Sequence, residues 1–125
     1  MIHGIGTDIV AVARLRGMWE QHGERIVRKL LAPSEQGDFE RAPDKGRFLA
    51  KRFAAKEAFA KALGSGVRAP ATLPAIAVTH DELGKPILEF SPELASLLQG
   101  RGLVAHLSIS DEADFAVAYV LIESP

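Results

Sequence analysis

Asp8 is an acidic residue in a segment that otherwise resembles a β-strand, where aspartate is disfavoured. β-Branched and small residues alternate from Gly4 to Ile9, and Asp8 falls on the same face as the two glycines of this segment. Two interpretations fit this pattern. Asp8 caps a helix that begins near Val10, or its carboxylate, beside glycines that permit a close approach, binds a hard cation such as Mg²⁺.

Glu57 is the second acidic candidate, because helical spacing places it on a stripe that is otherwise apolar. Lys61 follows one turn later, so an ordinary ion pair between the two is one interpretation. Seven basic residues and a single acid nevertheless lie between Lys45 and Arg68. Five of the basic residues are predicted on the helix of Glu57: Arg47, Lys51, Arg52, Lys56 and Lys61. Such a helix presents either a solvated basic face or a surface for phosphate.

The remaining polar motifs do not match several common catalytic signatures. Ile9 stands where a dinucleotide fingerprint needs its third glycine, and the glycine-rich segment 64–70 is not followed by the lysine of a P-loop. His106, Ser108 and Ser110 alternate on one predicted strand face, about 6.5–7 Å apart, too far for a nucleophile and its base. No serine elbow motif is present either. This row of polar side chains fits a polar ligand or a half-exposed strand.

Composition predicts a folded protein of one domain. The chain has 125 residues, of which 47% are hydrophobic and 25% are charged, which is typical of a globular protein rather than a disordered one. It has no cysteine, and its four histidines are not spaced as zinc ligands. No secretory leader or membrane span is expected, and the predicted location is the cytoplasm.

The charge is divided between the two halves of the chain. Residues 1–68 contain 13 Lys and Arg against 8 Asp and Glu, whereas residues 69–125 contain 2 against 8. The net charge of -1 therefore conceals a basic first half and an acidic second half. This asymmetry predicts an acidic or phosphorylated partner for the first half, and neither a nucleic acid nor a membrane is expected as a partner.

Periodicity predicts the elements that position these side chains. Strands are expected at 1–10, on both sides of Gly84-Lys85-Pro86, at 103–110 and at 114–123. Helices are expected over 12–31 with an interruption at 22–23, from a Ser34 cap to before Pro43, from Asp44 to Leu63 with Gly64 as its C-cap, and over 92–99. The predicted class is α+β, a small, mainly antiparallel sheet packed against helices.

These motifs together resemble the holo-[acyl carrier protein] synthases, the short bacterial 4′-phosphopantetheinyl transferases. The resemblance covers essentially all of residues 1–125 as a single domain. The motifs are GIGTDIV, RFLAKRFAAKEAFAKALGSGVR, DELGKP and HLSISDEADFAVAYVLIE. The pairing of GTD with KE-x-x-x-K is specific, whereas GKP and the His-Ser strand only corroborate it.

The resemblance implies an activity and a site. Such enzymes move phosphopantetheine from coenzyme A to a serine of apo-acyl carrier protein in fatty acid biosynthesis, and release adenosine 3′,5′-bisphosphate. Asp8 and Glu57 would bind Mg²⁺, and Lys61 would neutralise phosphate or protonate the leaving group. The implied coenzyme A contacts are Arg52, Lys61, Gly64, Ser65, Lys85, Pro86, His106 and Ser108. The base that activates the serine is left open between Glu57, Asp111 and a metal-bound water.

The resemblance also implies two kinds of protein contact. Acyl carrier proteins are acidic, and Arg14, Arg25 and Arg28 are the candidate docking residues for one. Related short enzymes are homotrimers with active sites between subunits, so that His106 would come from a neighbouring protomer. Two alternatives remain, namely a non-catalytic module that binds coenzyme A or carrier protein, and a different Mg²⁺-dependent enzyme acting on a nucleotide.

Overall fold

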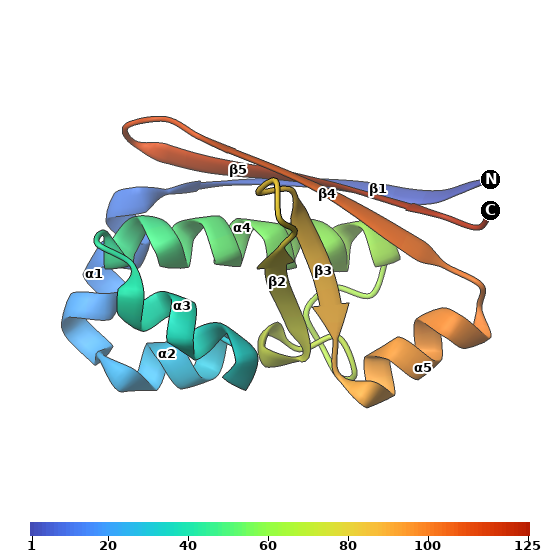
Figure 1. The fold of residues 1–125 in the computed structure, drawn as a ribbon, viewed down its shortest axis with the longest axis horizontal. Coiled ribbons are helices and arrows are strands. Elements are labelled where there is room, and N and C mark those ends of the chain that lie inside the picture. Colours follow the sequence, from blue (N-terminus) through green and yellow to red (C-terminus); the bar gives the residue numbers. More distant parts are fainter.

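The longest helix, α4 (Lys45–Leu63), lies along one face of a three-stranded antiparallel sheet of order β1-β5-β4 (Figure 1). The computed structural model describes residues 1–125. The strands are β1 (Ile2–Ala11), β2 (Ile76–His80), β3 (Pro86–Phe90), β4 (Val104–Asp111) and β5 (Phe115–Glu123). The other helices are α1 (Val12–His22), α2 (Glu24–Leu30), α3 (Gln36–Arg41) and α5 (Pro92–Gly100). The predicted α+β class is confirmed.

Local sequence sets both ends of α4. The Asp44 side chain accepts a hydrogen bond from the Arg47 backbone N–H at 3.1 Å and so caps the first turn. At the other end Gly64 adopts a left-handed conformation, with φ of 90°, which glycine tolerates best. The alanines in between favour a helix and leave little bulk on its surface. The boundaries predicted for this helix are confirmed.

Two glycines of β1 allow α4 to approach the sheet closely. A Cβ atom on Gly4 would lie 2.1 Å from the carbonyl oxygen of Ala62, and one on Gly6 would lie 2.1 Å from that of Ala58. Both distances are far below van der Waals contact, so only glycine fits there. The space that these glycines clear beside Asp8 is therefore filled by the backbone of α4.

Gly6→Ala is expected to lower the free energy of unfolding by about 1–3 kcal/mol, the usual cost of overpacking. The matched control is Gly17→Ala in α1, where an added Cβ meets no atom within 4 Å. The control should be neutral or stabilising, because alanine favours a helix over glycine. Urea unfolding at one protein concentration measures both, and a Gly6→Ala protein as stable as the wild type would contradict the close packing.

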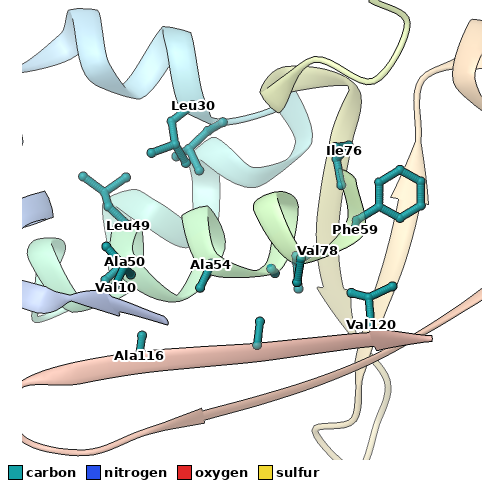
Figure 2. Close-up of a cluster of buried hydrophobic side chains, with 14 of the residues drawn as sticks. Val10, Leu30, Leu49, Ala50, Ala54, Phe59, Ile76, Val78, Ala116 and Val120 are labelled. Atoms are coloured by element: carbon teal, nitrogen blue, oxygen red, sulfur yellow. The ribbon is translucent and has the colours of Figure 1, made fainter. Parts of the chain in front are cut away.

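The hydrophobic core lies on both sides of α4 (Figure 2). On the sheet side, Ala54 faces buried residues of β5 such as Ala116 and Val120. On the other side, Phe59 lies against the β2–β3 hairpin, and its ring centroid is 4.9 Å from that of Phe90. Because α4 is buried on two sides, it forms the central layer of the fold, between the three-stranded sheet and the β2–β3 hairpin.

The opposite face of the sheet has no element of the chain packed on it (Figure 1). Large apolar side chains project from this face, which we call the open face. They include Ile5, Ile9, Phe115 and Tyr119, with exposures of 57%, 64%, 49% and 44%. An exposed apolar surface of this kind is typical of an interaction site.

The short segment after α2 departs from the prediction. Residues Pro33–Glu35 form a single 3₁₀ turn before α3, so Ser34 lies inside this turn and does not cap a helix. The Glu35 side chain instead turns inward and accepts a hydrogen bond from the Ala32 N–H at 2.9 Å. The other predicted elements are present. No helix of the chain has the length and apolar character needed to span a membrane.

Candidate active site

Asp8 belongs to β1 and is not a helix cap, because α1 begins four residues later at Val12 without a side-chain cap. Its carboxylate lies on the face of β1 that packs against α4, and its side chain is 17% exposed. The Lys61 ammonium, from the last turn of α4, lies 3.2 Å from Asp8 Oδ1 and donates to the Thr7 carbonyl oxygen at 2.9 Å. The sheet and the helix therefore meet at an ion pair.

Glu57 lies one turn before Lys61 on α4 and completes this group of charges. Burial raises the pKa of the Glu57 carboxyl, and the nearby Asp8 carboxylate raises it further, while Lys61 and Arg14 oppose both effects. The Glu57–Lys61 ion pair, which was one interpretation of their spacing, is not formed, because the Lys61 ammonium is directed to Asp8 instead. Asp8, Glu57 and Lys61 thus form one site, with two carboxylates in mutual repulsion.

Two of the basic residues expected on the surface of α4 are inside the protein. Lys56 is fully buried and Arg52 is 5% exposed. Both bind the buried Glu35 carboxylate, with Lys56 Nζ 2.5 Å from Oε1 and Arg52 Nη1 2.8 Å from Oε2. The Val78 N–H also donates to Glu35, at 3.0 Å. Arg52 and Lys56 therefore do not belong to a solvated basic face, and Glu35 was not among the residues that the sequence singled out.

A cavity of about 280 Å³ lies beside this cluster, near the N-terminal half of α4. Its lining residues are Pro43, Asp44, Arg47, Phe48, Lys51, Arg52, His80 and Ile109. The Arg52 guanidinium is held over the Phe48 ring, 4.4 Å from its centroid. Burial lowers the pKa of His80, and the nearby Arg52 and Lys51 lower it further. The basic side chains that line this cavity outnumber its single acidic one, Asp44, and this balance suits an anion.

Asp111 does not lie free at the end of β4. Its Oδ2 accepts a hydrogen bond from Arg47 Nη1 at 3.0 Å, and its Oδ1 lies 3.7 Å from Lys51 Nζ. Arg47 also donates to the carbonyl oxygens of Glu112 and Ala113 in the following turn. The Asp111 carboxylate thus ties the β4–β5 turn to α4, and both of its oxygen atoms already have a basic partner.

His106 and Ser108 lie on β4 and project from the open face of the sheet, as their alternation predicted. His106 Nε2 lies 2.6 Å from Glu123 Oε2 at the end of β5. Asp8, in contrast, lies on the face that packs against α4. In one copy of the chain, these polar residues and the Asp8 site are therefore on opposite faces of the sheet.

The other candidate contacts lie at two turns. Gly64 and Ser65 follow α4 directly, just beyond Lys61, and Ser65 is half-buried. Lys85 lies in the turn between β2 and β3, and Pro86 begins β3. The Asp81 side chain fixes this turn by accepting from the Lys85 N–H at 2.9 Å.

The three docking candidates are exposed on the first two helices, with Arg14 on α1 and Arg25 and Arg28 on α2. The Arg14 guanidinium lies 5.4 Å from the Phe53 ring centroid, and its charge lowers the pKa of Glu57. Arg14 therefore connects this basic surface to the site formed by Asp8, Glu57 and Lys61.

Comparison with known proteins identifies relatives along nearly the whole chain. Residues 4–120 match the family profile described as the 4′-phosphopantetheinyl transferase superfamily. A holo-[acyl-carrier-protein] synthase of Dechloromonas aromatica is 74% identical, over 98% of both chains. The crystal structure of such a synthase from Neisseria meningitidis superimposes with a TM-score of 0.95 at 43% identity, covering 98% of this chain and 99% of the other.

A related crystal structure includes a ligand. The holo-(acyl-carrier-protein) synthase of Bacillus anthracis, described in complex with CoA (3′,5′-ADP), is 35% identical and has a TM-score of 0.84, covering 100% of this chain and 99% of that one. The similarity therefore extends to a protein whose ligand contains phosphates.

Proposed function

Because the chain belongs to the 4′-phosphopantetheinyl transferase superfamily, we propose that it transfers 4′-phosphopantetheine from coenzyme A to a serine of apo-acyl carrier protein. The carrier serine oxygen forms a bond to the phosphorus next to the pantetheine arm. The bond from that phosphorus to adenosine 3′,5′-bisphosphate breaks. The observation that supports this activity most directly is the Asp8–Lys61 ion pair between β1 and α4, with the Glu57 carboxyl near enough for the charges of both residues to shift its pKa.

Asp8 and Glu57 fit a divalent cation such as Mg²⁺. Their carboxylates offer the oxygen ligands that Mg²⁺ prefers, and their mutual repulsion contributes to the raised pKa of Glu57. The chain has no cluster of three or more His, Cys, Asp or Glu side chains suited to a metal ion. Two carboxylates leave positions for substrate phosphate oxygens, and a bound Mg²⁺ would stabilise negative charge on the diphosphate.

Lys61 supplies the mobile positive charge of the site. Its side chain is 53% exposed, so the ammonium can reach a phosphate near Asp8. There it neutralises charge that develops on the leaving phosphate, or donates a proton to it. Glu57 is the better placed of the two carboxylates considered as base, since Asp111 is paired with Arg47. If Glu57 binds the metal, however, its basicity is reduced.

Two of the proposed coenzyme A contacts, His106 and Ser108, point to a second copy of the chain. His106 and Ser108 lie on the open face, away from Asp8, so one copy cannot present both groups to one ligand. The exposed Ile5, Phe115 and Tyr119 make this face suitable for burial against another copy. We therefore propose a homotrimer in which a neighbouring protomer supplies these residues, while Gly64, Ser65, Lys85, Pro86 and Arg52 complete the coenzyme A contacts.

Arg14→Glu and Arg25→Glu are expected to raise KM for acyl carrier protein by about tenfold each, because rim charges steer an acidic partner. KM for coenzyme A should change much less, and the effect should shrink at high salt. Arg41→Glu is the matched control, because Arg41 is an exposed basic residue at the end of α3. Steady-state kinetics with each substrate varied would measure these effects, and equal effects on both KM values would place the docking surface elsewhere.

The proposed reaction can be tested by intact-mass spectrometry. Apo-acyl carrier protein is incubated with this protein, coenzyme A and Mg²⁺, with and without EDTA. The expected result is a gain of one phosphopantetheine per carrier protein, which EDTA abolishes. Binding of coenzyme A without a mass gain would instead identify a non-catalytic module.

A further inference from the structure

Lys61 occupies a position in this structure that a metal ion could also use. Its ammonium lies 2.9 Å from the Thr7 carbonyl oxygen and 3.2 Å from Asp8 Oδ1. Both partners are oxygen atoms, one of them charged, and oxygen ligands of this kind attract hard cations. In this geometry, part of the coordinating capacity of Asp8 is already taken by the chain's own cation.

The neighbouring carboxylate has no such partner. Glu57 lies one helical turn from Lys61, but the ammonium forms its close contacts with β1 instead. The site therefore has two carboxylates and a single ammonium, which pairs with only one of them, while the Arg14 guanidinium adds a further positive charge near Glu57. A divalent ion that binds both carboxylates must compete with Lys61 for Asp8.

Lys61 is able to leave Asp8 without disturbing the fold. Its side chain is 53% exposed, compared with 17% for Asp8. A lysine has a flexible four-carbon stem and a compact charge, so the ammonium can move while the carboxylate stays fixed by the close packing of β1 on α4. An anion beside the site would provide a second partner for the displaced ammonium.

We propose that Lys61 and the divalent cation compete for Asp8, and that the diphosphate of coenzyme A favours the cation by drawing the Lys61 ammonium away from this carboxylate. This inference rests on the proposed function, because it takes Asp8 and Glu57 as the metal site. Linkage then requires each ligand to strengthen the binding of the other. Lys61 consequently lowers the affinity of the free protein for the metal, and it supports the reaction only after coenzyme A has bound.

Metal binding without coenzyme A provides the test. Mn²⁺ serves as a probe with similar preference for oxygen ligands, and electron paramagnetic resonance measures the free ion. Lys61→Met is expected to bind Mn²⁺ about tenfold more tightly than the wild type, within the usual range of coupling between sites. Lys61→Arg retains a cation near Asp8 and should remain close to the wild type.

The matched control is Lys51→Met on the same helix, because Lys51 pairs with Asp111 and not with Asp8. Its Mn²⁺ affinity should stay within about twofold of the wild type, since distant charges are screened. A similar gain in Lys51→Met and Lys61→Met would attribute the effect to net charge and overturn the proposal. Unchanged affinity in Lys61→Met, or no Mn²⁺ binding by either protein, would also overturn it.

A second titration, with coenzyme A present and no carrier protein, measures the coupling. Coenzyme A should increase Mn²⁺ affinity by a larger factor in the wild type than in Lys61→Met, and equal factors would contradict the exchange. Phosphopantetheine transfer by the wild type is measured in parallel with Mg²⁺. Absence of transfer would refute the proposed function, whereas transfer with unchanged metal affinity in Lys61→Met would refute only the role given to Lys61.

Discussion

Asp8→Asn and Glu57→Gln are each expected to slow phosphopantetheine transfer by at least about 10²-fold, the usual loss when one electrostatic group of a reacting site is removed. Each change keeps the size of the side chain but removes one of the two negative charges at the meeting point of β1 and α4. The remaining carboxylate binds a divalent cation weakly, so charge on the leaving phosphate is poorly stabilised. Initial rates from intact-mass spectrometry at high Mg²⁺ concentration measure the loss.

The fold should survive both changes, because neither side chain belongs to the hydrophobic core. In Asp8→Asn the amide oxygen would still accept a hydrogen bond from Lys61, and circular dichroism should match the wild type. Glu93→Gln, on the exposed first turn of α5, is the matched control and should retain full activity. Near-normal turnover of either site variant in saturating Mg²⁺ would disprove the assignment of metal binding to Asp8 and Glu57.

Most of the secondary structure follows from local sequence. The α4 boundaries were predictable because Asp44 and Gly64 have the side-chain and backbone properties that begin and end helices. The order β1-β5-β4 was not predictable, since it depends on pairing between the two ends of the chain. Periodicity identifies which face of a strand is apolar but does not identify its neighbour.

The site was predictable in its residue types but not in its contacts. An aspartate among glycines and a glutamate on an apolar helical stripe were recognisable departures from their surroundings. The spacing of Glu57 and Lys61 favoured a pair within one helix, yet Lys61 binds Asp8 across 53 positions of sequence. This contact requires the backbone of α4 to lie close to β1. The absence of side chains on Gly4 and Gly6 allows that short distance.

The burial of Arg52 and Lys56 could have been predicted from their positions along the helix, although not from the number of basic residues. Arg52 and Lys56 follow Leu49 and precede Phe59 at alternating steps of three and four, the spacing of one helical face. This face is buried, and so the two basic residues on it are buried as well. Helical spacing thus distinguishes them from Arg47 and Lys51, whereas their acidic partner, Glu35, comes from another segment.

Glu35→Ala is expected to lower the free energy of unfolding by about 3–5 kcal/mol, the usual cost of removing one partner from a buried ion pair. The Glu35 carboxylate accepts from Arg52, Lys56 and two backbone N–H groups, those of Ala32 and Val78. Its loss leaves two buried cations without a counter-charge. Urea unfolding measures the loss, with the exposed Glu93→Ala as the control, and a loss no larger than that of the control would contradict this role.

The pH dependence of stability provides an independent check on this cluster. Burial lowers the pKa of Lys56 from 10.5 to about 8, and the Glu35 carboxylate opposes that decrease. Between pH 8 and 10.5 the unfolded chain therefore binds more protons at this lysine than the folded protein does, so the contribution of Lys56 to stability increases with pH. In Glu35→Gln the pKa of Lys56 should fall further, and the increase should begin at lower pH. Lys56→Met should abolish the part of the increase that is due to this lysine, because it removes the titrating group while Arg52 still pairs with Glu35.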